Sequence, residues 1–532
     1  MEGQPMVKQA YITLMGRSPW AVVNSFHALV IETDFRPDRI VFIYESQYSK
    51  VIEPVIKGLE TIQQTFTKPR IEGIEVPDWD MHAAGEQTRL VVKKLEEDGA
   101  EVALNITAGR KALVAGTLLG LLGRRLDYLY YLTIETTGDA AKPYLMIPKR
   151  IQQLRELKKN AVCTRDIVLD PGTGWVGMEL AREYLMVVLN HAYKEHVRIV
   201  VKAPLLDSDI IELDPFERKV HMLTDRARYD ASLRACRDID WDHPTYSQLR
   251  ESLCFSGILE YRTGNQFREF LLESYRRHRD PRSSLGKWYL SLDSNLFYGG
   301  VVSCLDLFER TNQIRRGELL YVTSDGVVQE IDRKVARKYP AEYLRAAKAG
   351  CQSGKTRLLD EFHNRNTLET RIAKMASSEL SKLMKWPTHE RAECGELPID
   401  HEAADRVIVK SVSEFAARKG ATVTFLSAEP NMENHCRSAG NLGCFVLEPP
   451  NEIPHTLEIT DQGFIDLLVA LSVLYGVVKL DRIGYLFGDY GGKGSVDYMS
   501  TVKVVFDNLH RAKLVEEHIN TCRKLIELGI SE

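Results

Sequence analysis

Trp288-Tyr289-Leu290-Ser291-Leu292-Asp293-Ser294-Asn295 is the stretch of sequence from which the fold can be worked out. A run of mostly apolar residues followed directly by an acid predicts a buried strand that ends at a carboxylate. The same order recurs at residues 421–429, where Ala-Thr-Val-Thr-Phe-Leu leads through Ser-Ala to Glu429. Open α/β sheets gather their functional groups at the carboxyl ends of the strands, so Asp293 and Glu429 are expected to lie close together.

Two further acids stand beside apolar runs. Glu330 follows the run at residues 319–323, and Asp405 is expected to open an apolar helix at residues 406–409. Carboxylates gathered at one place repel each other unless a cation lies between them, and hard oxygen ligands select Mg²⁺ or Mn²⁺. The candidate metal ligands, which are also the candidate catalytic residues, are therefore Asp293, Glu330, Asp405 and Glu429.

The order of these acids resembles the PIN nuclease family, in which one strand ends in Asp-x-Asn, a helix carries Glu, another helix begins with Asp, and a later strand ends in Thr-x-Asp. The resemblance covers residues 286–450, with Glu429 standing where the family has Asp and a long stretch between Glu330 and Asp405. It implies a PIN-like α/β domain with divalent-metal-dependent endoribonuclease activity, which hydrolyses RNA and leaves 5′-phosphate ends.

Residues 7–147 alternate strand and helix signals, which predicts a parallel, doubly wound, Rossmann-like sheet. Strands are expected at residues 10–15, 39–44, 71–76, 101–106 and 127–134, with helices at residues 19–30, 49–63, 83–98 and 112–122. Two of the strand-to-helix turns are rich in small and basic residues, namely Gly16-Arg17-Ser18-Pro19 and Asn105-Ile106-Thr107-Ala108-Gly109-Arg110-Lys111. Such turns present backbone N–H groups to an anion, which favours a phosphate-bearing ligand. Any Rossmann-like sheet also needs glycine turns, and that simpler interpretation stays open.

The second turn resembles the Asn-x-Thr-Gly-Gly-x-Lys signature of the CARF (CRISPR-associated Rossmann fold) sensor family, with Ala108 in place of the first glycine. The resemblance covers residues 7–150. It implies a homodimer whose two-fold axis runs through a pocket for a cyclic oligoadenylate, such as cyclic tetra-adenylate or hexa-adenylate, that acts as an allosteric activator. By matching position the ligand contacts are Ser18, Asn105, Thr107, Gly109 and Lys111, and Arg17 and Arg110 are added from their charge.

The remaining segments carry weaker patterns. Residues 151–159 and 178–196 have helical periodicity, residues 198–201 favour a strand, and residues 246–261 have a helix–turn pattern, all compatible with a helical or winged-helix-like connector. The C-terminal part is expected to be a helical tail, with helical segments at residues 464–478, 481–487 and 496–513, the last of which is a candidate DNA-binding helix. The expected domains are residues 1–150 (sensor), 151–285 (connector), 286–450 (nuclease) and 451–532 (helical region).

Composition limits the choice of function. The chain has 532 residues, too many for one core, and its net charge of −4 confines any nucleic-acid contact to local basic patches such as residues 276–282. Nine cysteines occur without a Cys-x-x-Cys pair, which favours a reduced cytoplasm over a disulfide framework or a zinc site. No secretory signal is visible, and the longest apolar segment, residues 464–480, contains Asp466 and Lys479, so no membrane span is expected.

Together the two resemblances imply a cytoplasmic, homodimeric effector of type III CRISPR antiviral defence, in which a ring messenger activates RNA cleavage. Two alternatives stay open. The first is a messenger-responsive transcription regulator whose PIN-like region is catalytically silent. The second is a sensor that degrades its own messenger, with Ser18 and Lys111 positioning a ribose hydroxyl.

Overall fold

The computed structural model describes residues 8–63, 69–136, 140–165, 172–194, 198–236, 241–280, 286–315, 317–351, 353–494 and 498–530. The chain divides into two compact units. The first comprises Met1–Thr173, Glu183–Val197 and Asn508–Glu532, and the second comprises Gly174–Arg182 and Arg198–Asp507. The first unit contains a seven-stranded sheet, and the second contains a five-stranded and an eight-stranded sheet.

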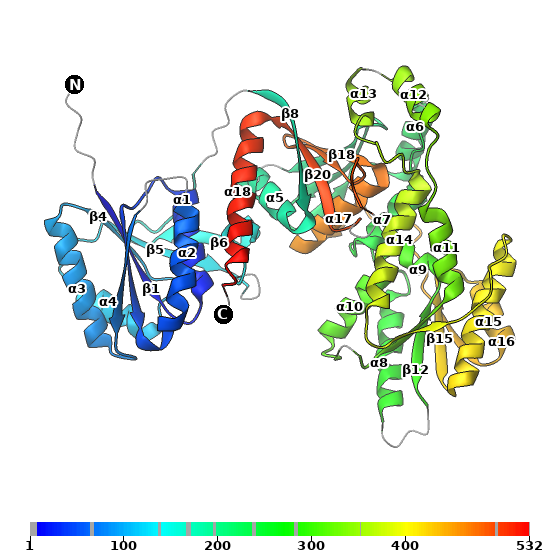
Figure 1. Cartoon of the computed structure of the whole chain (residues 1–532), viewed down its shortest axis with the longest axis horizontal. Helices are drawn as coiled ribbons and strands as arrows, with labels where there is room; N and C mark the ends of the chain where they lie inside the picture. The colour runs from blue at the N-terminus through cyan, green and yellow to red at the C-terminus, as the bar shows by residue number, and fades with distance from the viewer. Residues whose placement is uncertain are drawn as a thin grey trace. The chain divides into compact units, whose positions relative to one another are not determined.

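The seven-stranded sheet has the strand order β3-β2-β1-β4-β5-β6-β7. Its parallel strands are β1 (Gln9–Met15), β2 (Arg39–Glu45), β3 (Arg70–Val76), β4 (Glu101–Asn105) and β5 (Tyr128–Ile134), which confirms the five predicted strands. Helices α1 (Pro19–Glu32) and α2 (Ile52–Gln63) cover one face, and α3 (Met81–Glu97) and α4 (Lys111–Gly120) cover the other (Figure 1). All four helices were predicted, although a 3₁₀ turn, η1 (Ser46–Val51), precedes α2.

The helix predicted at residues 151–159 is wrong. Residues 152–156 form β6 (Gln152–Glu156), which pairs antiparallel with β5 and with β7 (Ala161–Val162). Burial alternates along β6, but two of its buried side chains, Gln152 and Glu156, are polar. Gln152 donates to two backbone carbonyls and Glu156 accepts from two backbone N–H groups across the turn. Because these polar residues occupy core positions, the period-two pattern was hidden in the sequence.

Two further helices belong to the first unit, α5 (Leu185–Lys194) and the C-terminal α18 (Leu509–Glu527). Helix α18 packs against α2 and α5. The indole Nε1 of Trp20 donates to the backbone carbonyl of Ile530 at 2.9 Å, so the end of the chain is bonded to the first helix of this unit.

The five-stranded sheet is wholly parallel, with the order β14-β13-β12-β15-β16. Its strands are β12 (Trp288–Leu292), β13 (Leu320–Ser324), β14 (His389–Ala392), β15 (Thr422–Ser427) and β16 (Leu442–Val446), and the two predicted strands, β12 and β15, are confirmed. The associated helices are α8 (Gly264–Arg279), α9 (Ser294–Tyr298), α10 (Val301–Thr311), α11 (Asp325–Val335), α14 (Leu368–Met384), α15 (His401–Lys419) and α16 (Met432–Ala439). Since β12 and β15 are parallel neighbours, their carboxyl ends meet at one edge.

The expectation that Asp405 opens a helix is wrong. Helix α15 begins at His401, and the side chain of Asp400 caps it by accepting a hydrogen bond from the backbone N–H of Ala403 at 2.9 Å. Asp400 is therefore the N-cap, and Asp405 lies one turn further along the helix. The long stretch before α15 contains α12 (Ala341–Gly350), α13 (Ser353–Leu359), α14 and β14.

The eight-stranded sheet has the order β17-β11-β10-β9-β18-β19-β20-β8. Its strands are β8 (Thr173–Ala181), β9 (Ile199–Ala203), β10 (Ser208–Asp214), β11 (Lys219–Met222), β17 (Thr456–Glu458), β18 (Val477–Leu480), β19 (Gly484–Phe487) and β20 (Thr501–Asn508). Helices α6 (Arg226–Ala235), α7 (Tyr246–Phe255) and α17 (Asp461–Tyr475) accompany it. The sheet thus draws strands from both the predicted connector and the predicted helical tail.

The prediction of a purely helical tail is wrong. Helix α17 is present, but Gly476, with a φ of 78°, ends it, and residues 477–480, 484–487 and 501–508 are strands. Gly484 allows β19 to approach β20 closely, since a Cβ there would lie 2.1 Å from the carbonyl oxygen of Val505. The predicted helix at residues 178–196 also begins too early, because residues 173–181 form β8. Strands β18 and β19 are mostly buried on both faces, so their apolar runs lack the alternation that identifies a strand.

Candidate functional site

Asp293 lies at the carboxyl end of β12 and is almost fully buried. Its Oδ1 accepts from the backbone N–H of Ser294 at 2.8 Å, which caps α9. Its Oδ2 accepts from Asn295 Nδ2 at 2.9 Å and from the Ser427 hydroxyl at 2.6 Å. Three donors therefore fix the orientation of this carboxylate.

Asn295 and Ser427 join the ends of β12 and β15. Asn295 Oδ1 accepts from the backbone N–H of Ala428 at 3.0 Å, and Asn295 Nδ2 lies 3.4 Å from Glu429 Oε1. Ser427 Oγ accepts from the backbone N–H of Glu429 at 3.0 Å. The sequence analysis did not assign a role to either residue, although the Asp-x-Asn and Ser-x-Glu patterns at neighbouring strand ends were the available signal.

The acids of this edge influence each other electrostatically. Burial, together with the charges of Asp405 and Glu429, raises the pKa of Asp293 to about 7 despite the lowering effect of its hydrogen bonds. Burial also raises the pKa of Asp405, with Glu429 and Glu330 adding to the increase and the imidazoles of His435 and His401 opposing it. Asp405 therefore interacts electrostatically with each of the other three predicted acids.

Glu330 is engaged by a cation on its own helix. Its Oε1 lies 2.9 Å from Lys334 Nζ, one turn along α11, and that ammonium lies 5.4 Å from the centre of the Tyr298 ring. Within the described residues, no group of three or more histidine, cysteine or acidic side chains is arranged to hold one metal ion. The carboxylates that a hard cation would meet near this edge are those of Asp293 and Glu429, which follow strands, and that of Asp405 on α15.

In the first unit, the two predicted anion-binding turns abut. A Cβ on Gly16 would lie 2.3 Å from the carbonyl oxygen of Ala108, so the first turn needs glycine to approach the second. Asn105 is fully buried, and its Oδ1 accepts from the backbone N–H of Thr107 at 2.7 Å. Thr107 Oγ1 in turn accepts from the backbone N–H of Leu132 at 2.8 Å. These two side chains shape the turn and tie it to β5.

Of the other predicted ligand contacts, some are exposed and others are engaged within the protein. Arg17 and Lys111 are exposed, and Ser18 precedes α1 without capping it. Gly109 is tightly packed, since a Cβ there would lie 2.7 Å from Val114 Cγ2. Arg110 is paired with the buried carboxylate of Glu45, with 3.3 Å between Nη1 and Oε2.

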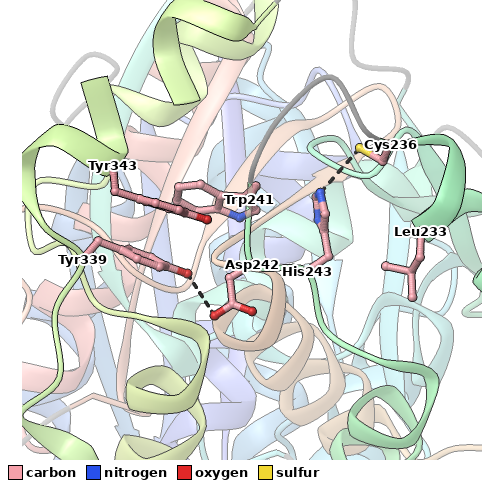
Figure 2. Close-up of a pocket in the computed structure, with 7 residues that line it drawn as sticks. All are labelled: Leu233, Cys236, Trp241, Asp242, His243, Tyr339 and Tyr343. Atoms are coloured by element: carbon pink, nitrogen blue, oxygen red, sulfur yellow. Dashed lines mark hydrogen bonds between the residues drawn. The ribbon is translucent and has the colours of Figure 1, made fainter. Parts of the chain in front are cut away.

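The sequence analysis missed a pocket in the second unit, with a volume of about 590 Å³. Figure 2 shows its lining residues, which are Leu233, Cys236, Trp241, Asp242, His243, Tyr339 and Tyr343. The rings of Tyr339 and Tyr343 are stacked at 4.5 Å, and the Tyr339 hydroxyl donates to Asp242 Oδ2 at 3.2 Å. No sequence signal could have located this site, because its residues come from segments about a hundred positions apart.

Cys236 and His243 are in contact in this pocket. Cys236 Sγ lies 3.4 Å from His243 Nε2 and donates to the carbonyl oxygen of Leu205 at 3.1 Å. Burial, together with the charges of Lys355 and Arg371, lowers the pKa of His243 to about 4. The imidazole is therefore neutral near pH 7, and the pair lacks the imidazolium that activates a catalytic thiolate.

No protein-family model matches the chain, and no curated protein sequence matches it. Solved structures that resemble it weakly include the following three. Protein VC1899 from Vibrio cholerae has a TM-score of 0.25 at 9% identity, with 88% of this chain and 98% of that chain covered. A type III CRISPR defence DNA nuclease activated by cyclic oligoadenylate has a TM-score of 0.19 at 14% identity, with 88% of this chain and 70% of that chain covered. A UDP-N-acetylglucosamine 2-epimerase has a TM-score of 0.18 at 9% identity, with 92% of this chain and 94% of that chain covered.

These scores and identities carry no argument about fold or activity. In the part of the chain that the structure describes, no helix is both long enough and apolar enough to cross a membrane.

Proposed function

We propose that this protein is a metal-dependent endoribonuclease of type III CRISPR defence that a cyclic oligoadenylate activates. The observation that carries the proposal is the electrostatic interaction of Asp293, at the end of β12, with Asp405 on α15 and with Glu429, which follows β15. Burial and mutual repulsion raise the pKa of two of these acids, so their ionised forms gain from a nearby cation.

The donor set suits Mg²⁺ or Mn²⁺, which prefer carboxylate oxygen. Asp293, Asp405 and Glu429 would hold the ion once their side chains have drawn together, and Glu330 would join them by leaving Lys334. A bound ion would supply Lewis-acid stabilisation of a phosphoryl oxygen and a water of lowered pKa. Asn295 and Ser427 hold the Asp293 carboxylate in a fixed orientation, which limits the reorganisation needed during reaction.

The sensor part of the proposal rests on the two abutting turns of the first unit. Exposed Arg17 and Lys111 lie beside the N-termini of α1 and α4, where backbone N–H groups and the helix dipole favour an anion. A cyclic tetra-adenylate or hexa-adenylate would place its phosphates there. Asn105 and Thr107 would act indirectly, by holding the turn in shape.

Helix α4 supports the homodimer. Apart from Lys111 and Thr117 its residues are apolar or glycine, yet Leu118 and Leu119 in its last turn and Leu122 just beyond it are 37%, 64% and 75% exposed. Helix α3 covers the opposite side at close range, since a Cβ on Gly120 would lie 2.2 Å from the Gly85 carbonyl oxygen. A helix that is apolar all round is ordinarily buried, so a second copy of the chain would cover the leucines.

The alternative function as a transcription regulator depended on a DNA-binding helix at residues 496–513, which does not form as predicted. Residues 501–508 of the predicted helix form β20, and α18 buries Ala512 and Val515 among the residues of the first unit. These side chains are not exposed to meet a DNA groove.

The test is to incubate the protein with Mn²⁺, labelled RNA and each ring, omitting each component in turn, while measuring RNA products and intact ring. We expect 5′-phosphate RNA products only when metal and one ring are both present. Asp405→Asn should lower the cleavage rate by orders of magnitude. Asp400→Asn is the matched control, because asparagine caps a helix as well as aspartate does. Absence of RNA cleavage with every ring, or loss of ring without RNA cleavage, would refute the proposal.

A further inference from the structure

Trp79 is an unusual residue at the edge of the seven-stranded sheet. It lies between the end of β3 and the start of α3, and 66% of its surface is exposed. Its backbone has a φ of 63°, in the left-handed region that glycine and asparagine adopt most readily. An exposed tryptophan adds no packing to the core, and its positive φ is unfavourable for the loop backbone, which points to a functional constraint.

A buried carboxylate sustains this conformation. Glu45, which is almost fully buried at the end of β2, accepts from the backbone N–H of Trp79 at 2.8 Å. The flanking acids shape the same loop, since Asp78 accepts from the backbone N–H of Gln47 and Asp80 caps α3 through Ala83. These hydrogen bonds between carboxylates and backbone N–H groups fix the loop that carries the indole.

Arg110 supports the indole on one face. Its guanidinium carbon lies 3.3 Å from the centre of the Trp79 ring, and its Nη1 reaches the second oxygen of Glu45. Because Arg110 occupies one face and the side chain is two-thirds exposed, the opposite face is presented to solvent. The result is a flat, rigid aromatic surface with a cation behind it.

The position of this surface matches the proposed ligand. Trp79, Arg110 and Arg17 follow three neighbouring or near-neighbouring strands of one parallel sheet, so they share its carboxyl edge. Proteins bind unpaired bases by stacking them on aromatic rings and bind their phosphates with cations and helix N-termini. We infer that Trp79 stacks against an adenine base of the ring messenger, an inference that rests on the proposed function for the identity of the ligand.

The experiment compares ring binding by the full-length protein and three variants, using calorimetry with cyclic tetra-adenylate and cyclic hexa-adenylate. Trp79→Gly should weaken binding roughly 10-fold or more, the scale of losing one base-stacking contact. The same variant should keep or raise its thermal unfolding midpoint, because glycine adopts a positive φ without strain. Trp79→Phe should retain most of the affinity, and Leu90→Ala, at another exposed apolar position on α3, should bind like wild type.

A second measurement uses a ring that carries 2-aminopurine in place of one adenine. Stacking on the indole should quench its fluorescence in wild type and should quench it much less in Trp79→Gly. If wild type binds a ring and Trp79→Gly binds it equally well, the stacking inference is wrong while the proposed function stands. If wild type binds neither ring, both are wrong.

Discussion

Replacing Asp293 with asparagine should remove a pH-dependent loss of stability from the five-stranded sheet. The folded-state pKa of this buried acid is about 7, well above its ordinary value of 3.8. The protonated form therefore contributes stability that is fully present below pH 3.8 and is lost as the pH rises through 7. Asparagine has nearly the same shape and cannot ionise, so it lacks this dependence.

The magnitude follows from the difference between the ordinary pKa of 3.8 and the folded-state pKa of about 7. A difference of one pKa unit corresponds to about 1.4 kcal/mol, and about two such units contribute to the change in stability between pH 5 and pH 8. Wild type should thus lose about 2.5 kcal/mol more than Asp293→Asn over this interval in the presence of EDTA. The asparagine amide would also face a donor on Asn295, but that cost is independent of pH and cancels in the difference.

Hydrogen exchange at the backbone amides of residues 286–298 and 421–431 is the appropriate assay, because it reports the local stability of this edge in a chain of two units. Exchange rates are corrected for the intrinsic effect of pH, and Asp400→Asn serves as the control. Adding Mn²⁺ at pH 8 should restore much of the loss in wild type, since a cation favours the ionised carboxylate. Equal pH dependence in wild type and Asp293→Asn would refute the reasoning.

Three other predictions test the remaining parts of the proposal. Lys111→Ala should weaken ring binding by on the order of 1.5–3 kcal/mol, because a charge-assisted phosphate contact is lost; unchanged affinity by calorimetry would remove Lys111 from the site. Leu119→Glu combined with Leu122→Glu should convert a dimer to a monomer, measured by light scattering, with the secondary structure intact by circular dichroism; a double variant that stays dimeric would place the interface elsewhere. Glu429→Asp should keep substantial RNA cleavage, whereas Glu429→Gln should need more Mn²⁺ for half activity; superimposable metal titrations would exclude Glu429 as a ligand.

The five parallel strands of the N-terminal sheet could be predicted from the sequence because each is short and is separated from a helix by glycine or polar turns, whereas β6 could not. Gly16 and Gly109 are examples, since each stands where a side chain would collide with a neighbouring element. The eight-stranded sheet could not be predicted, because residues 477–487 are largely apolar on both faces and are interrupted only by a short turn. Their partners in β9 lie nearly three hundred positions earlier, beyond the range of any local pattern.

The convergence of Asp293 and Glu429 was predictable because parallel strands end at the same edge. The roles of Asn105 and Thr107 were not. A polar side chain in a turn can bond to a ligand or to a backbone group, and only the folded chain shows that Thr107 meets the N–H of Leu132 on the next strand. The contact between Lys334 and Glu330 was within reach, since residues four apart on a helix face each other.

The bond between Trp20 and Ile530 has a consequence for the synthesis of this protein. Helix α18 is made more than three hundred residues after α5, yet it packs against α2 and α5, and all three belong to one unit. During translation, the surface of the first unit that α18 covers stays exposed until more than three hundred further residues have left the ribosome. A truncation that removes only the final helix should therefore expose apolar surface on the earliest part of the chain, and chaperones would be expected to bind there during translation.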